Sequence, residues 1–146
     1  MRIWILSFIL LIAVLIEATF TTIPLALLLL INFLILEKKS WVFAASFFSG
    51  LALDILSLRY LGSTSLYFVI VLFIINLYER KFETSNIYFV LFTSFVGSFF
   101  YLTVFEVRLA LSQAVLSAFL GSIIFFLMTI LSKKENLDYK YRAEKQ

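Results

Sequence analysis

The sequence contains neither cysteine nor histidine among its 146 residues. Without cysteine, the chain has no disulfide framework and no cysteine-ligated metal site. Without histidine, it lacks the most common general base and the most common metal ligand of proteins. Its four glycines are not clustered as a phosphate-binding loop requires. We therefore expect no catalytic residues, no cofactor and no metal, and we predict that the protein is not an enzyme.

Charge is scarce as well. Charged residues make up 14% of the chain and hydrophobic residues 63%, whereas soluble domains have about a quarter charged and half apolar. A chain of this size cannot hide so much apolar surface in one core, so we predict that the lipid bilayer is its solvent. The net charge is only +3, and no basic patch is interleaved with aromatic residues. We expect no nucleic-acid partner.

Six apolar runs follow one another along the chain, at residues 3–20, 23–36, 41–57, 61–78, 86–107 and 110–131. Each run is expected to form a transmembrane helix, and the turn after the first ends at Pro24, which opens the second. The pattern predicts an all-α, polytopic membrane protein. Its six-helix transmembrane domain would cover residues 1–132. A charged, loosely ordered cytoplasmic tail would cover residues 133–146.

The second run is unusually short for a membrane span. Its 14 residues reach about 21 Å as a helix, whereas the hydrocarbon core of a bilayer is about 30 Å thick. The helix either extends into Glu37 or thins the bilayer locally. Omitting this span would destroy the charge bias described next, which supports keeping it.

Lysine and arginine predict the orientation of the six spans. Ten of them fall on the side of the two termini and of the second and fourth loops, and only Arg59 and Arg108 fall on the other side. Positive charge is retained in the cytoplasm, so both termini are predicted to be cytoplasmic. The ten residues are Arg2, Lys38, Lys39, Arg80, Lys81, Lys133, Lys134, Lys140, Arg142 and Lys145.

Asp54 is the acidic residue that lies deepest within an apolar run. A carboxylate in lipid costs roughly 3 kcal/mol on insertion scales, so Asp54 is expected to have a partner. That partner is either an arginine or the backbone amides that open the fourth span. Ser46 and Gly50 share a helical face with Asp54 at a spacing of four residues, and small residues allow close helix packing. We therefore predict a packing face here, and the alternative that Asp54 favours is a face that is functional as well.

Five charged residues fall at the predicted outer ends of the helices: Glu17, Asp54, Arg59, Glu106 and Arg108. The three acids and two bases could pair with one another there. For Glu17, Glu106 and Arg108, ordinary interfacial charge that reaches water is an equally good interpretation. For Asp54 we favour a paired and packed role.

The motif Gly50-x-x-x-Asp54-Ile55-Leu56-Ser57-x-x-x-Leu61-Gly62 resembles one in the bacterial rod-shape-determining protein MreD family. That family has a similar Gly-x-x-x-Asp-Leu-Leu-Ser followed by Leu-Gly across its third span and the start of its fourth. The position of Pro24, the chain length, the short second helix and the charged tail are similar too. The resemblance covers most of the chain in layout and about a dozen residues in motif.

This resemblance implies a non-enzymatic integral membrane scaffold of the machinery that elongates the bacterial cell wall. The implied partners are the periplasmic protein MreC, the actin homologue MreB, and the RodA polymerase with its penicillin-binding protein. The implied location is the bacterial cytoplasmic (inner) membrane. We take Ser46, Gly50, Asp54, Arg59, Gly62 and Arg108 as candidate structural or partner-binding residues.

The family's fold looks like that of the S components of energy-coupling-factor vitamin transporters, so a six-helix bundle of S-component type is expected. The alternative function is accordingly a substrate-binding S component of a small-molecule transporter. Such a protein needs an outward-open pocket lined by polar and aromatic residues. A membrane protein with a chance match to the motif is the third possibility.

Overall fold

The protein, described by a computed structural model, forms six α-helices and, over the residues described, no strand. The structure describes residues 3–20, 23–37, 41–79, 87–105 and 110–143. The side chains of Ile3, Phe20, Glu37, Glu79 and residues 132–143 lie outside this description. The helices are α1 (Ile3–Phe20), α2 (Leu25–Glu37), α3 (Trp41–Leu56), α4 (Ser63–Glu79), α5 (Ile87–Val104) and α6 (Ala110–Ala143).

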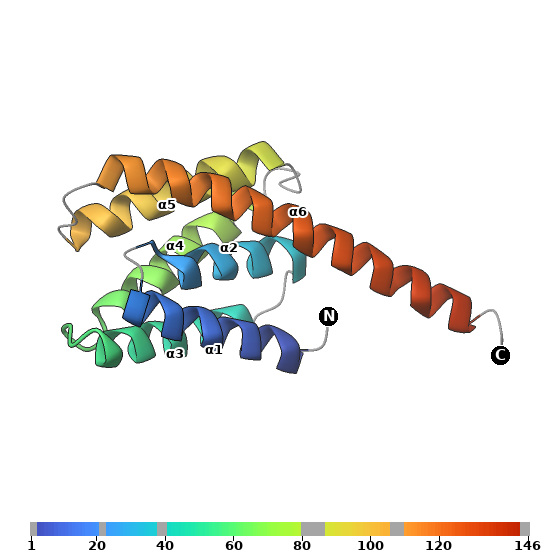
Figure 1. The fold of residues 1–146 in the computed structure, drawn as a ribbon, viewed down its shortest axis with the longest axis horizontal. Coiled ribbons are helices and arrows are strands. Elements are labelled where there is room, and N and C mark those ends of the chain that lie inside the picture. The colour runs from blue at the N-terminus through green and yellow to red at the C-terminus, as the bar shows by residue number, and fades with distance from the viewer. Residues whose placement is uncertain (1–2, 21–22, 38–40, 80–86, 106–109, 144–146) are drawn as a thin grey trace.

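The six helices run alternately in opposite directions (Figure 1). Helices α1, α3 and α5 end, and α2, α4 and α6 begin, at one end of the bundle, which we call the Asp54 end. The N-terminal start of α1 and the far end of α6 lie toward the opposite end, which we call the termini end. The up-and-down order expected from the six apolar runs is therefore confirmed.

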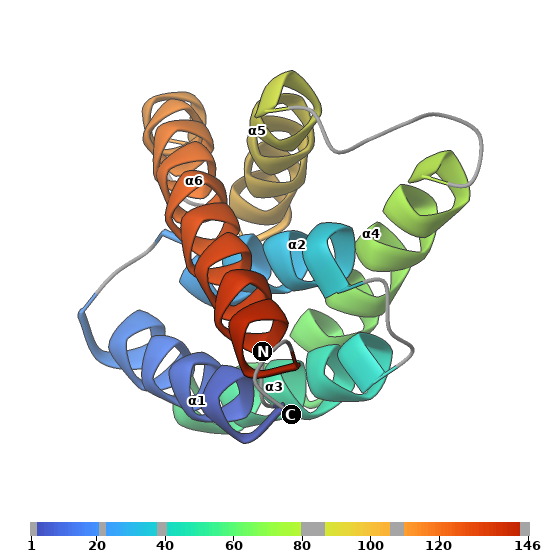
Figure 2. The same cartoon turned by 90° about the vertical axis from the view of Figure 1, so that its right-hand side faces the viewer.

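Helix α2 lies in the middle of the bundle (Figure 2) and contacts each of the other five helices. Every side chain from Ala26 to Ile35 is at most 9% exposed. A helix that is apolar all round is typically buried on all sides, which explains its composition. One of the two expectations for this short run was that the helix extends into Glu37, and it does. The helix is nevertheless only 13 residues long. Because the other helices surround α2, the length of this helix does not have to match the thickness of a bilayer.

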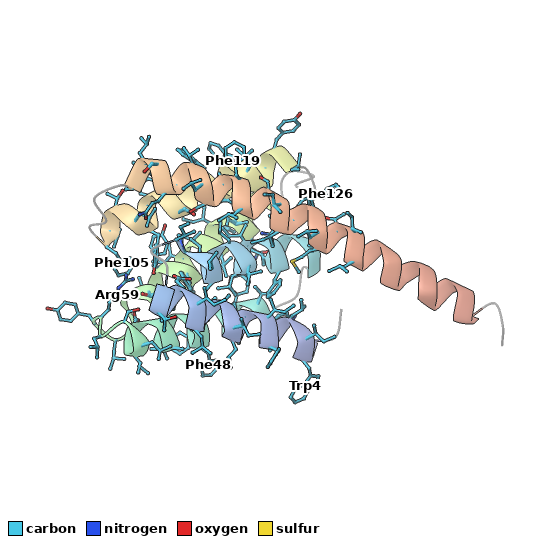
Figure 3. All side chains as sticks on the ribbon, in the orientation of Figure 1. Trp4, Phe48, Arg59, Phe105, Phe119 and Phe126 are labelled. Carbon is cyan, nitrogen blue, oxygen red and sulfur yellow. The ribbon has the colours of Figure 1, made fainter. Side chains whose placement is uncertain are left out.

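The outer faces of the other helices carry large apolar side chains. Trp4 is 87% exposed, Phe48 69%, Phe119 60% and Phe126 59%, and all four point away from the bundle in Figure 3. Among the described residues, two helical stretches, Ile87–Val104 and Ala110–Leu131, are long and apolar enough to cross a membrane. The apolar stretches of the other four helices are shorter.

Helix α6 continues well beyond the last apolar residue and ends at Ala143 after 34 residues. Residues 133–143, which the sequence suggested as a tail separate from the six helices, continue α6 in the structure. The segment from 133 to 143 contains no glycine or proline, and seven of its eleven residues are good helix formers: three lysines and one each of glutamate, leucine, arginine and alanine. Intrinsic helix propensity thus extends α6 where hydrophobicity ends.

Helices α3 and α4 approach each other closely at Gly50. A Cβ atom added to Gly50 would lie 2.5 Å from the backbone nitrogen of Ser65 and 2.7 Å from its Cβ. The added Cβ atom would also clash with the Cα atom of Ser65. Backbone therefore packs on backbone here, as the predicted face of small residues requires.

We predict that Gly50→Ala lowers the free energy of unfolding by about 1–3 kcal/mol, because the added methyl group meets a backbone that cannot rotate away. Gly97→Ala is the matched control in α5. Its added Cβ would have no neighbour closer than 3.6 Å, so the higher helix propensity of alanine should leave stability unchanged or raise it by up to about 1 kcal/mol. Thermal unfolding of the purified protein in detergent measures both, and equal losses would contradict the close crossing.

Candidate functional site: the Asp54 end of the bundle

The Asp54 carboxylate caps the beginning of α4. Asp54 is fully buried. Its Oδ2 atom accepts the backbone N–H of Gly62 at 2.8 Å, and its Oδ1 atom accepts the N–H of Thr64 at 3.1 Å and the hydroxyl of Ser63 at 3.2 Å. The first N–H groups of a helix have no partner within it, and acidic groups stabilise that end. The carboxylate thus satisfies donors that would otherwise be unpaired.

The turn between α3 and α4 is held in a specific backbone conformation. Gly62 has φ +93°, a value that favours glycine, and Leu58 has φ +52°, which is uncommon for a leucine. A left-handed residue just after a helix is a common way to end it. The N–H of Arg59 also donates to the Asp54 carbonyl at 2.9 Å. Asp54 therefore binds the turn through both its backbone and its side chain.

The predicted face of α3 is confirmed as a packing face. Ser46, Gly50 and Asp54 are all buried, together with Ser49 and Leu53. The Ser46 hydroxyl donates to the carbonyl of Phe43, one turn earlier in the same helix, at 2.7 Å. Its hydrogen-bonding capacity is used within α3, so its role is that of a small residue at a helix contact.

A second buried acid, Glu17, caps the beginning of α2. Glu17 is 7% exposed. Its Oε2 atom accepts the N–H of Ala26 at 2.8 Å, and its Oε1 atom accepts the Tyr101 hydroxyl at 3.2 Å. The sequence left open pairing with a base and simple interfacial charge. Glu17 is buried, and the partners described for its carboxylate are an amide and a tyrosine hydroxyl, so neither interpretation describes it fully.

Arg59 is connected to Glu17 through hydrogen bonds that both residues make with the Tyr101 hydroxyl group. Its Nη1 donates to the Tyr101 hydroxyl oxygen at 2.9 Å. Its guanidinium carbon lies 4.3 Å from the centre of the Phe105 ring, a cation–π arrangement. Figure 3 labels the two residues at this end of the bundle. Arg59 therefore connects the α3–α4 turn to α5 and, through Tyr101, to α1.

The structure places the sequence-predicted residues in two groups. Asp54, Arg59 and Gly62 meet at the Asp54 end, and Ser46 and Gly50 lie further along the same face of α3. Among the described contacts, Asp54 binds the amides of α4 and Arg59 binds Tyr101. The amide alternative for Asp54 is thus the one observed. Arg108, and Glu106 beside it, lie outside the described residues.

Two participants were not foreseen in these roles. Tyr101 bridges Glu17 and Arg59, and the N-terminus of α2 binds Glu17. Tyr101 follows Gly97 by one helical turn on the inner face of α5, and this position is the only sequence signal for its burial. Nothing in the sequence pairs it with Glu17, 84 residues away.

The capped turn presents three apolar side chains at its surface. Leu58 is 94% exposed, Tyr60 92% and Leu61 72%. We call these three residues the turn triad. The hydrogen bonds of the buried Asp54 carboxylate and the contact between Gly50 and Ser65 fix the position of the turn. The backbone that carries the turn triad is therefore held in place. Among the described residues, no group of three potential metal ligands occurs.

Comparisons with protein-family models, with curated proteins and with solved structures found no match to this chain. The resemblance noted from the sequence therefore rests on the motif from Gly50 to Gly62 and on the layout of the helices.

We predict that Asp54→Leu destabilises the protein more than Asp54→Asn. Leucine leaves the buried N–H group of Thr64 without an acceptor, at about 1–3 kcal/mol, and leaves the partly buried N–H group of Gly62 unpaired at a smaller cost. Asparagine keeps one acceptor oxygen and should lose about half as much. Thermal unfolding of both variants in detergent tests the order, and equal melting temperatures would show that the cap is not what stabilises the turn.

We also predict that Tyr101→Phe lowers the free energy of unfolding by about 1–3 kcal/mol, because it removes a hydroxyl that serves both Glu17 and Arg59 in a buried site. Tyr88→Phe in the same helix is the control, since Tyr88 is 76% exposed and should tolerate the change. A loss of the same size in both variants would argue against the network.

Proposed function

We propose that the protein is a non-enzymatic integral membrane scaffold of the bacterial cell-wall elongation machinery, similar to the MreD family. In this proposal it crosses the cytoplasmic membrane six times with both termini in the cytoplasm, as a bundle of S-component type. The Asp54 end then faces the periplasm. Its partners are an MreC-like protein on that side, an MreB-like protein in the cytoplasm, and RodA with its penicillin-binding protein.

The distribution of apolar surface supports a membrane location for the whole bundle. Monomeric soluble proteins rarely expose contiguous apolar patches larger than a few hundred Å², whereas half-exposed or fully exposed leucine, isoleucine and phenylalanine side chains occur on α1, α3, α4, α5 and α6. Helix α2 is shielded by the others, so its 13 residues need not match the bilayer thickness. The ten-to-two distribution of basic residues favours cytoplasmic termini.

The geometry of the motif is the observation that carries the functional proposal. Gly50 allows the α3–α4 crossing, Asp54 caps α4, and Gly62 supplies both the N–H that Asp54 binds and the positive φ of the turn. Each of these residues has a structural task that depends on the others. This mutual dependence argues against a chance match and favours a rigid platform for the turn triad.

A scaffold agrees with the state of the polar groups better than a transporter subunit does. The carboxylates of Asp54 and Glu17 are occupied by hydrogen bonds from the protein itself. An S component requires a polar and aromatic pocket that opens to the outside. A cavity between α4 and α5 has a lining that is mainly apolar.

The experiment that tests this function is recovery of an MreC-like protein from the source membrane with the tagged full chain. We predict that replacing both Tyr60 and Leu61 by serine lowers recovery at least fivefold without changing the melting temperature, because both side chains are exposed. The control is Tyr88→Ser, an exposed residue at the start of α5 and thus at the termini end, which should leave recovery unchanged.

Two results would change this proposal. Undiminished recovery of the MreC-like protein with the serine variant would remove the turn triad from the interface and leave the scaffold itself in place. Absence of any such protein from the parent sample, together with saturable uptake of a vitamin by vesicles that contain the chain, would favour the transporter subunit instead.

A further inference from the structure

The last part of α6 extends beyond the rest of the bundle. The stretch of α6 that is apolar enough to cross a membrane ends at Leu131, and the helix continues to Ala143. Figure 1 shows this continuation projecting past the ends of the other helices at the termini end. We call residues 133–143 the α6 arm. Ala143 lies about 18 Å beyond Leu131 along the helix axis, at about 1.5 Å per residue.

The arm is a preformed helix because α6 precedes it. An isolated helix as short as the arm is marginal in water, since forming its first turn is costly. The arm needs no new first turn, because it continues a helix that already packs against α2 and α5. A partner that binds the arm therefore does not have to order it, which lowers the cost of binding.

The sequence of the arm gathers basic and apolar residues around Leu137. On a helix, the neighbours of a residue on the same face are those three and four positions away. For Leu137 these four neighbours are three lysines and a tyrosine. Leu137 also follows Ile130 by two helical turns, and Ile130 is 49% exposed, so the group continues the outer register of α6. We call the group the basic face: Lys133, Lys134, Leu137, Lys140 and Tyr141.

The acids of the arm are not among these neighbours. Glu135 and Asp138 lie two and one residues from Leu137, and residues at these spacings do not share a face with it. Asp138 borders the basic face, one turn after Lys134. The retention of positive charge in the cytoplasm accounts for lysines next to the membrane, but it does not account for Leu137 and Tyr141 among them. The combined pattern indicates a binding face.

The position of the arm favours a protein over the membrane surface as its partner. The headgroup layer on each side of a bilayer is about 5–8 Å thick, whereas Leu137 and Tyr141 lie about 9 and 15 Å beyond Leu131 along the axis. Figure 2, which views the bundle from the termini end, shows α6 running toward the middle of the bundle. The arm thus stands over the other helices and not over the surrounding lipid.

We propose that the basic face of the α6 arm binds a cytoplasmic protein in a groove with an apolar floor and a rim of carboxylates. Leu137 and Tyr141 are one turn apart, which is the spacing of the apolar anchors of a helix bound in a groove. Carboxylates are the groups that complement the three lysines, and such complementary charge also speeds association. This inference rests on the cytoplasmic location of the termini proposed above, and it is independent of the turn triad.

The position of the binding face is tested by photo-crosslinking of the full chain in cells of its source. The photoreactive amino acid p-benzoylphenylalanine replaces Leu137 or Tyr141 in the test variants, and Tyr139 in the control. Tyr139 lies two residues from each test position and off the basic face. We expect both test variants to be joined to one and the same cytoplasmic protein, identified by mass spectrometry, with at least fivefold higher yield than the control.

The chemistry of the face is tested with that protein, purified, and with the full chain in nanodiscs of dioleoylphosphatidylglycerol. Lys140→Glu should weaken binding at least tenfold, because it places a carboxylate against the acidic rim. Arg142→Glu is the matched control, since it makes the same change of charge in the same segment but off the basic face, and it should weaken binding at most threefold.

The outcomes separate this inference from the proposal on which it rests. Cross-links to lipid or to a second copy of the chain, equal yields from all three positions, or equal losses from Lys140→Glu and Arg142→Glu would each overturn the binding face. Recovery of an MreC-like protein by a chain whose arm captures nothing would overturn the arm alone. Capture of a periplasmic protein would contradict the orientation itself. A captured cytoplasmic protein that is not actin-like would support the arm and count against the MreB-like partner.

Discussion

The buried carboxylate of Asp54 is the interaction on which the arrangement of α3 and α4 depends. A charged group can stay fully buried only where enough donors surround it, and here the donors come from the first residues of the next helix. Binding them fixes where α4 begins and how it leaves the turn. The beginning of α4 in turn brings Ser65 against Gly50, three residues after the capped segment starts at Gly62. The cap and the crossing are therefore one structural unit.

The same device occurs twice in the described chain. Glu17, near the end of α1, caps the beginning of α2, and Asp54, near the end of α3, caps the beginning of α4. In each case an acid from one helix neutralises the positive end of the next helix dipole. Tyr101 and Arg59 join the two caps into one network across five helices. The Asp54 end is thus a hydrogen-bonded layer, and the turn triad projects from its surface.

Sequence reasoning predicted the helices because apolar runs and charged turns mark them strongly, and α1 begins and ends where expected. It also predicted the packing face of α3, because small residues at a four-residue spacing have few other uses. It did not predict that α2 is central, since an apolar helix can face either lipid or protein. It could not pair Tyr101 with Glu17, because such contacts depend on how distant helices are placed. The extension of α6 was missed because the end of the helix was placed where the apolar residues end. The residues that follow have high helix propensity, and the helix continues through them.

The burial pattern shows why small and polar residues, more than apolar ones, determine this fold. Large apolar side chains occur both inside and outside the bundle, so hydrophobicity alone does not distinguish the two faces of a helix. The interior is distinguished by Ser46, Asn32 and Ser94, all fully buried. Asn32 donates to the carbonyls of Leu28 and Gly121 and so links α2 to α6. Because apolar burial does not distinguish the faces, close approach and hydrogen bonds between helices supply the specificity.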